Sequence, residues 1–138
     1  MVKFESEIKT ITAPQEQAFG VLSDLTNIKK HLDRLPEDQI QLDRIEEDAV
    51  FFKVENAGVL GLRIIDKEPF KTIKFESVSS PVAFNLWIQL KEVGENDTKV
   101  KLTLKAEMSS VVKMMIGKHI KTFLDKLSDA IATYDFNA

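Results

Sequence analysis

The stretch SSVVKMMIGKHIKTFLDKLSDAIATY (Ser109–Tyr134) decides the fold of this chain. Its apolar residues recur at three- and four-residue steps, the pattern of one face of an amphipathic helix, and a serine at its start can cap the first turn. We predict one uninterrupted helix from Ser110 to about Tyr134, because a glycine at position 117 costs a helix only about 1 kcal/mol relative to alanine. The predicted apolar face consists of Val112, Met115, Ile116, Ile120, Phe123, Leu127, Ile131 and Tyr134.

Most of the chain before this helix alternates apolar and polar residues, which indicates strands with one buried face. A first strand is predicted over Val2 to Thr10, and six more from Gln39 onward. Connections this short join antiparallel neighbours, since a parallel crossover needs about a dozen residues or more. The turn signals that separate the later strands lie at residues 46–48, 56–58, 66–69, 79–81 and 94–97.

Two short helices are predicted between the first two strands. Pro14 suits the first turn of one helix, where a missing amide donor is tolerated, and the apolar stripe of this helix ends near Leu22. A second stripe runs from Leu25 to Leu35, and Pro36 ends it.

Composition excludes several classes of function. The length of 138 residues with 43% hydrophobic content fits a single domain over residues 1–138. A net charge of −3, with both signs well mixed, argues against nucleic-acid binding. The absence of cysteine excludes disulfides and thiolate metal sites. No apolar window reaches the roughly 20 residues that span a bilayer, and no signal-peptide core is seen, so we expect no integral membrane segment and a cytoplasmic location.

The order of these elements resembles the helix-grip fold of the START and birch-pollen-allergen superfamily, also called SRPBCC or polyketide-cyclase-like. Its most specific pieces are the strand Phe4–Ile8, the junction Ile11–Phe19 with the following Leu22-Ser-Asp24, and the long C-terminal helix. The resemblance implies an α+β fold, in which a seven-stranded antiparallel curved sheet wraps around that helix and two short helices follow strand 1. It also implies a cavity under the N-terminal half of the helix, which in relatives holds lipids, sterols, polyketides or plant hormones.

The inward parity of each strand predicts the lining of such a cavity. Many inward apolar residues are expected to be ordinary core, whatever the function. His119 borders the helix face and could donate to a ligand oxygen or act as an acid or base near neutral pH. The residues predicted to contact the ligand are Phe52, Leu62, Phe75, Phe84, Leu86, Leu102, Met115 and His119.

Motifs for catalysis and metal binding are absent from the sequence. The acidic run Glu46-Glu47-Asp48 is interpreted as a solvated turn and not as a calcium site. We therefore expect no cofactor, no metal site and no catalytic residue, and we expect the chain to bind or carry a small hydrophobic molecule such as a lipid, sterol, quinone or polyketide-like compound.

Two alternatives to this function stay open. A cyclase or dehydrase-type enzyme would use His119 together with inward hydroxyls of Ser6, Thr10 and Ser77. A cochaperone-like protein-interaction domain would use the outer sheet face around Trp87. That tryptophan could also mark a homodimer contact, since aromatic residues are enriched at interfaces.

Overall fold

The structure is a computed structural model that describes residues 2–24, 40–46, 49–54, 58–79 and 82–133. Strands alternate with turns in the first two thirds of the chain, and a long helix ends it. The elements are β1 (Val2–Glu5), β2 (Lys9–Ile11), α1 (Gln15–Leu22), β3 (Ile40–Ile45), β4 (Ala49–Val54), β5 (Gly58–Glu68), β6 (Thr72–Val78), β7 (Phe84–Gly94), β8 (Asp97–Ala106) and α3 (Ser110–Thr133).

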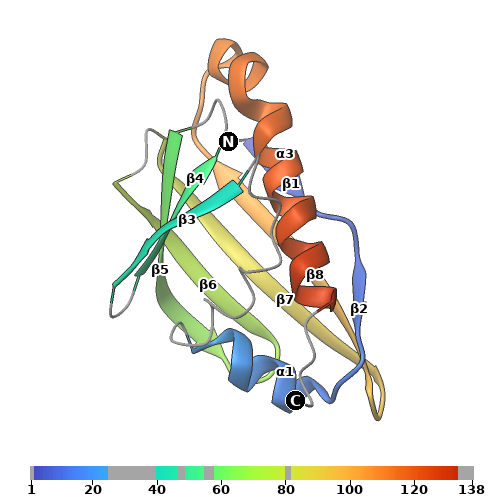
Figure 1. The fold of residues 1–138 in the computed structure, drawn as a ribbon. Helices are drawn as coiled ribbons and strands as arrows, with labels where there is room; N and C mark the ends of the chain where they lie inside the picture. Colours follow the sequence, from blue (N-terminus) through green and yellow to red (C-terminus); the bar gives the residue numbers. More distant parts are fainter. Residues whose placement is uncertain (1, 25–39, 47–48, 55–57, 80–81, 134–138) are drawn as a thin grey trace.

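All strands belong to one antiparallel sheet in the order β1-β8-β7-β6-β5-β4-β3, and β2 also pairs with β8. The predicted meander of six strands from β3 to β8 is confirmed. The sheet curves around α3, which lies along β1, β2 and β8 (Figure 1). The fold is therefore α+β and compatible with a helix grip.

The predicted first strand is interrupted, so the described part of the chain forms eight strands in seven positions of the sheet instead of the predicted seven strands. Ser6, just after β1, donates its amide to the carbonyl of Leu102 at 2.9 Å, while its hydroxyl accepts from the Leu102 amide at 2.9 Å. The amide of the next residue, Glu7, donates to Asp125 of α3 at 3.0 Å. Ser6 thus keeps its place in the ladder through its side chain, and the chain then bulges toward α3.

The long helix runs without a break through Gly117, as predicted. A Cβ at this position would lie 3.5 Å from the ring of Phe4, so the helix passes close to β1 there. Helix α1 ends at Leu22, near the predicted end, but it begins at Gln15, so Pro14 is its N-cap residue and not part of the first turn as predicted. The predicted second short helix, from Leu25 to Leu35, and Tyr134 lie outside the described residues.

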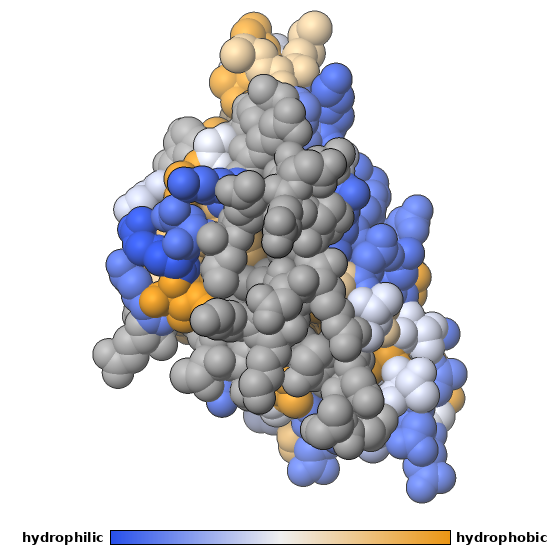
Figure 2. Space-filling view, in the orientation of Figure 1, coloured by the Kyte–Doolittle hydropathy of each residue, from blue (hydrophilic) through white to orange (hydrophobic). Residues whose placement is uncertain are grey.

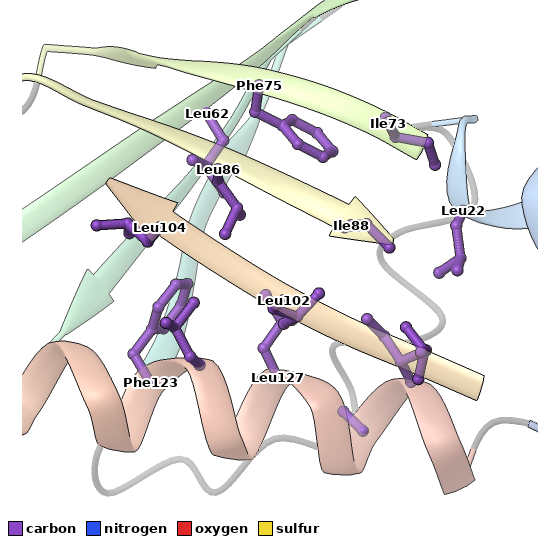
Figure 3. Packing of buried hydrophobic residues seen from close by; sticks show 14 of the residues in the cluster. Leu22, Leu62, Ile73, Phe75, Leu86, Ile88, Leu102, Leu104, Phe123 and Leu127 are labelled. Carbon is purple, nitrogen blue, oxygen red and sulfur yellow. The ribbon is translucent and has the colours of Figure 1, made fainter. Parts of the chain in front are cut away.

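The strand parity is confirmed for Phe52, Phe75, Phe84, Leu86 and Leu102, which are all buried. Figure 3 shows the side chains of β7 and β8 packed toward those of α3. Lys53, the neighbour of Phe52 in β4, is exposed. The register shifts between Ile64 and Asp66, where the adjacent apolar residues Ile64 and Ile65 leave the strand parity ambiguous.

One phenylalanine is buried on the opposite, outer face of the sheet. Phe51 precedes Phe52 in β4 and pairs with Gly61 of β5, where a Cβ would meet the Phe51 ring at 2.7 Å. The Arg44 guanidinium covers the other side of this ring, 3.8 Å from its centroid. Gly61 and Arg44 therefore explain how two adjacent phenylalanines are both buried, each with 1% of its surface exposed.

Candidate functional site

The six strand residues of the predicted ligand site gather on the concave face of the sheet, opposite α3. Each has at most 8% of its surface exposed. Figure 3 shows Leu86 and Leu102 pointing toward the side of α3 that carries Phe123. Phe52 lies on β4, Leu62 on β5, Phe75 on β6, Phe84 and Leu86 on β7, and Leu102 on β8.

Helix α3 covers this concave face unevenly. It lies along β1, β2 and β8, whereas the buried apolar side chains continue across β7, β6 and β5 to β4. Phe52 spans the sheet–helix interface, because its ring meets the ring of Phe123 edge-on at a centroid distance of 5.4 Å. The space between α3 and the central strands is thus bounded by apolar side chains.

The buried polar residues of the described chain carry only hydroxyl groups, and none is ionisable. Ser6 is bound to the backbone of Leu102, as described above. Thr98 donates to the carbonyl of Ala13 at 2.8 Å, and Ser128 donates to the carbonyl of Asp125 at 2.8 Å. These hydroxyls therefore serve the backbone and are not free to orient a ligand.

The other two hydroxyls considered from the sequence are also engaged. Ser77 accepts a hydrogen bond from the amide of Phe84 at 3.0 Å. Thr10 is exposed and accepts from the ammonium of Lys99 at 2.6 Å. The prediction that Thr10 faces inward is wrong, because the break after Glu5 resets the parity of this edge.

The helix side of the predicted site lies apart from the six strand residues. Met115 is 66% exposed, so it does not join the buried face of α3. That face runs through Gly117, Ile120, Phe123 and Leu127, and at 100° per residue Met115 lies about 200° from Gly117. His119 is half-buried and forms no hydrogen bond with another described residue.

Trp87 lies half-buried on the outer face, as the parity predicted. The ammonium groups of Lys74 and Lys105 lie 5.4 Å and 5.5 Å from its ring centroid. Thr103, its partner in the β7–β8 ladder, is buried and donates to Gln89 at 2.8 Å. Thr103 is therefore buried although it lies on the outer face of the sheet.

Sequence reasoning missed a groove of about 550 Å³ along the outer side of the β7–β8 hairpin. Two of its lysines already have partners: Lys99 donates to Thr10, and Lys101 donates to Glu5 at 2.8 Å. The hydrogen bonds from Lys101 and then Lys3 hold the pKa of Glu5 below its usual value. No periodic signal marks the groove, which is lined by Ile8, Gln89, Leu90, Lys91, Val93, Lys99, Val100 and Lys101.

No helix in the described part of the chain is long and apolar enough to cross a bilayer. Within that same part, no cluster of three or more histidine or acidic side chains is arranged to hold a metal ion. The described side chains on the concave face offer apolar surface, and the imidazole of His119 on α3 is half-buried.

By sequence, the chain matches no family model and no curated protein. Its fold is similar to that of solved structures. Norcoclaurine synthase from Thalictrum flavum, solved with dopamine and hydroxybenzaldehyde, superposes with a TM-score of 0.73 at 16% identity, over 95% of this chain and 85% of that chain. A Thermobifida fusca protein gives 0.68 at 12% identity over 96% and 91%. XoxI from Bacillus cereus gives 0.66 at 15% over 96% and 94%. This likeness supports a helix-grip fold.

Proposed function

We propose that this chain binds a small hydrophobic molecule, such as a lipid, sterol, quinone or polyketide-like compound, between the concave face of the sheet and α3. The observation that carries the proposal is the apolar face that continues from β8 to β4, while α3 lies mainly along β1, β2 and β8 and meets β4 through the Phe52–Phe123 contact. Residues 1–138 act as one domain in this proposal. Its ligand contacts are Phe52, Leu62, Phe75, Phe84, Leu86 and Leu102, with His119 on the helix side; Met115 is 66% exposed and is not among them.

The driving force for such binding is burial of apolar area, which contributes about 25 cal/mol per Å². Because the six strand residues are already almost fully enclosed, a ligand reaches them only when α3 or neighbouring side chains shift. The Phe52–Phe123 contact would open in such a shift, since it joins β4 to the helix.

The test is a titration of the purified protein with a fatty acid, a sterol, a quinone and an aromatic polyketide, combined with solvent extraction of protein purified from its own host. Phe52→Leu changes the proposed site, and Phe51→Leu is its matched control, because the two residues are adjacent and equally buried on opposite faces of β4. We expect Phe52→Leu to weaken binding about three- to tenfold and Phe51→Leu to leave it unchanged. Equal effects of the two variants, or no binding and no extracted compound, would contradict the proposal and favour an interaction module.

A second candidate is a cyclase or dehydrase-type enzyme acting on such a ligand. It is favoured by the half-buried imidazole of His119, which forms no hydrogen bond with a described residue, and by the fold shared with norcoclaurine synthase. The recovered compounds from the titration decide between the candidates. Turnover that disappears in His119→Ala would establish the enzyme, whereas unchanged compounds and a modest change of affinity support the carrier.

A further inference from the structure

The N-terminal turns of α3 expose apolar side chains that have no cover among the described residues. Val111, Met114 and Met115 are 64%, 83% and 66% exposed. Figure 2 shows this part of the helix as a hydrophobic projection at the top of the molecule, and in Figure 1 the same turns extend beyond the ends of the strands. We call Val111, Met114 and Met115 the α3 tip.

Basic residues accompany the tip. The sequence from Ser109 to Leu124 contains three lysines and no acidic residue, although the whole chain has a net charge of −3. Lys118 follows Met114 and Met115 by four and three residues, so it shares their face of the helix. Lys113 and Lys118 are both exposed, and neither forms an ion pair with another described residue.

We propose that the α3 tip docks on an anionic lipid bilayer, with Val111, Met114 and Met115 inserted at the headgroup boundary and Lys113 and Lys118 against lipid phosphates. Lys118 lies on the face of the tip residues, whereas Lys113 lies about 200° from Val111 on the other side of the same turns, so the projecting end of the helix carries a lysine on each side. Apolar side chains accompanied by lysines are the features of an interfacial segment. Lysine stems extend along apolar surface and leave the ammonium at the headgroups. Each lysine near an anionic surface strengthens such binding.

Size and composition favour a bilayer over a protein partner. A stable protein interface buries about 800 Å² on each side, whereas the tip offers three side chains on a convex projection. The residues that dominate protein interfaces are tryptophan, tyrosine and arginine, and none occurs between Ser109 and Thr122. A fluid bilayer accepts a convex apolar tip without needing a complementary shape.

The proposed docking surface is separate from the proposed ligand site, so it is tested without any ligand. Co-sedimentation is measured with vesicles of phosphatidylcholine alone and of phosphatidylcholine with phosphatidylglycerol. We expect binding to the anionic vesicles that falls as salt rises, and that weakens at least about tenfold in the double variant Met114→Asp, Met115→Asp. Val93→Asp is the matched control, because Val93 is an exposed apolar residue on the β7–β8 hairpin, and it should bind like the wild type.

The lysines are tested one at a time. Lys113→Glu and Lys118→Glu should each weaken binding to anionic vesicles several-fold at low salt, whereas Lys91→Glu on the β7–β8 hairpin should change it little. The chain has no cysteine, so a single introduced cysteine can carry an environment-sensitive dye. We expect a blue shift on vesicle addition for dye at Met114→Cys and no shift for dye at Val93→Cys.

Three results would overturn the proposal. They are no vesicle binding by the wild type, equal binding by the tip double variant, and a wild-type dimer in sedimentation that dissociates in the tip variant, which would make a second copy the occupant. The tip variants should still bind the detergent-solubilised test compounds, because their altered residues are exposed. Loss of vesicle binding alone therefore concerns the docking surface, and loss of compound binding in the wild type concerns the proposed function.

Discussion

The two parts of α3 on either side of Gly117 both carry apolar residues, but their surroundings are opposite. Before Gly117, Val111, Met114 and Met115 are exposed, and after it Ile120 and Phe123 are buried. The difference comes from the sheet, because β1, β2 and β8 accompany the second part while the first part extends beyond the strand ends (Figure 1). Burial along this helix therefore depends on where the sheet ends, and hydrophobicity alone does not determine it.

Polar contacts add to this difference, since among the described residues they join the second part of the helix to the sheet edge and not the first. Asp125 accepts a hydrogen bond from the amide of Glu7 at 3.0 Å and one from Lys121 at 2.9 Å. Lys9 forms an ion pair with Asp129 at 2.7 Å. Residues 7 and 9, in and next to the bulge between β1 and β2, thus bond the helix to the sheet edge. The described tip residues form no hydrogen bond or ion pair of this kind.

The largest expected effect is that of Phe123→Ala in the buried part. The substitution removes a fully buried ring and its edge-on contact with Phe52, so it should lower the free energy of unfolding by about 3–5 kcal/mol. Met114→Ala in the exposed part should change it by less than about 0.5 kcal/mol. Urea denaturation measures both, and similar values for the two variants would contradict the division of the helix at Gly117.

Gly117→Ala tests the boundary itself and should stabilise the protein by up to about 1 kcal/mol. The new methyl group would lie 3.5 Å from the Phe4 ring and 3.5 Å from the Lys113 side chain, which are ordinary contacts. Gly61→Ala is the opposite control, because its Cβ would lie 2.2 Å from the carbonyl oxygen of Val78 and should destabilise the sheet. If Gly117→Ala lowered the stability instead, the space between β1 and the helix would be too small for the added methyl group, contrary to these distances.

The sequence predicted the elements whose periodic signal is long. The meander, the uninterrupted α3 and the inward side of β4, β6, β7 and β8 all follow from alternation or helical spacing over many residues. The failures occur where the pattern is locally ambiguous. Met114, Met115 and Ile116 are three consecutive apolar residues, so the phase of the helix was open there, and Met115 was assigned to the wrong side.

Long-range contacts explain the remaining errors. Val2 to Thr10 alternates without interruption, yet the strand breaks after Glu5 because Leu102 and Asp125 bond to Ser6 and Glu7. These partners lie about 100 residues away, so no local pattern contains them. The outer groove of the β7–β8 hairpin was missed for the same reason, since Ile8 joins it only through that break.

The smallest expected effect concerns the ion pair that fastens the buried part of α3. The Asp129 carboxylate, and after it Glu7, accepts hydrogen bonds from Lys9 and raises the pKa of that ammonium above its ordinary value of 10.5. A raised pKa means that the pair's contribution to stability is fully present below pH 10.5 and is lost as pH rises through the folded-state pKa.

Asp129→Asn should therefore melt at a slightly lower temperature than the wild type at neutral pH, and this gap in melting temperature should close at high pH. The gap should stay small, because both side chains are partly exposed and solvent screens them. Glu68→Gln, which removes a 3.8 Å pair with Lys71, is the control and should give a smaller gap. A gap for Asp129→Asn that persists unchanged above the titration of lysine would show that Asp129 acts through the helix and not through Lys9.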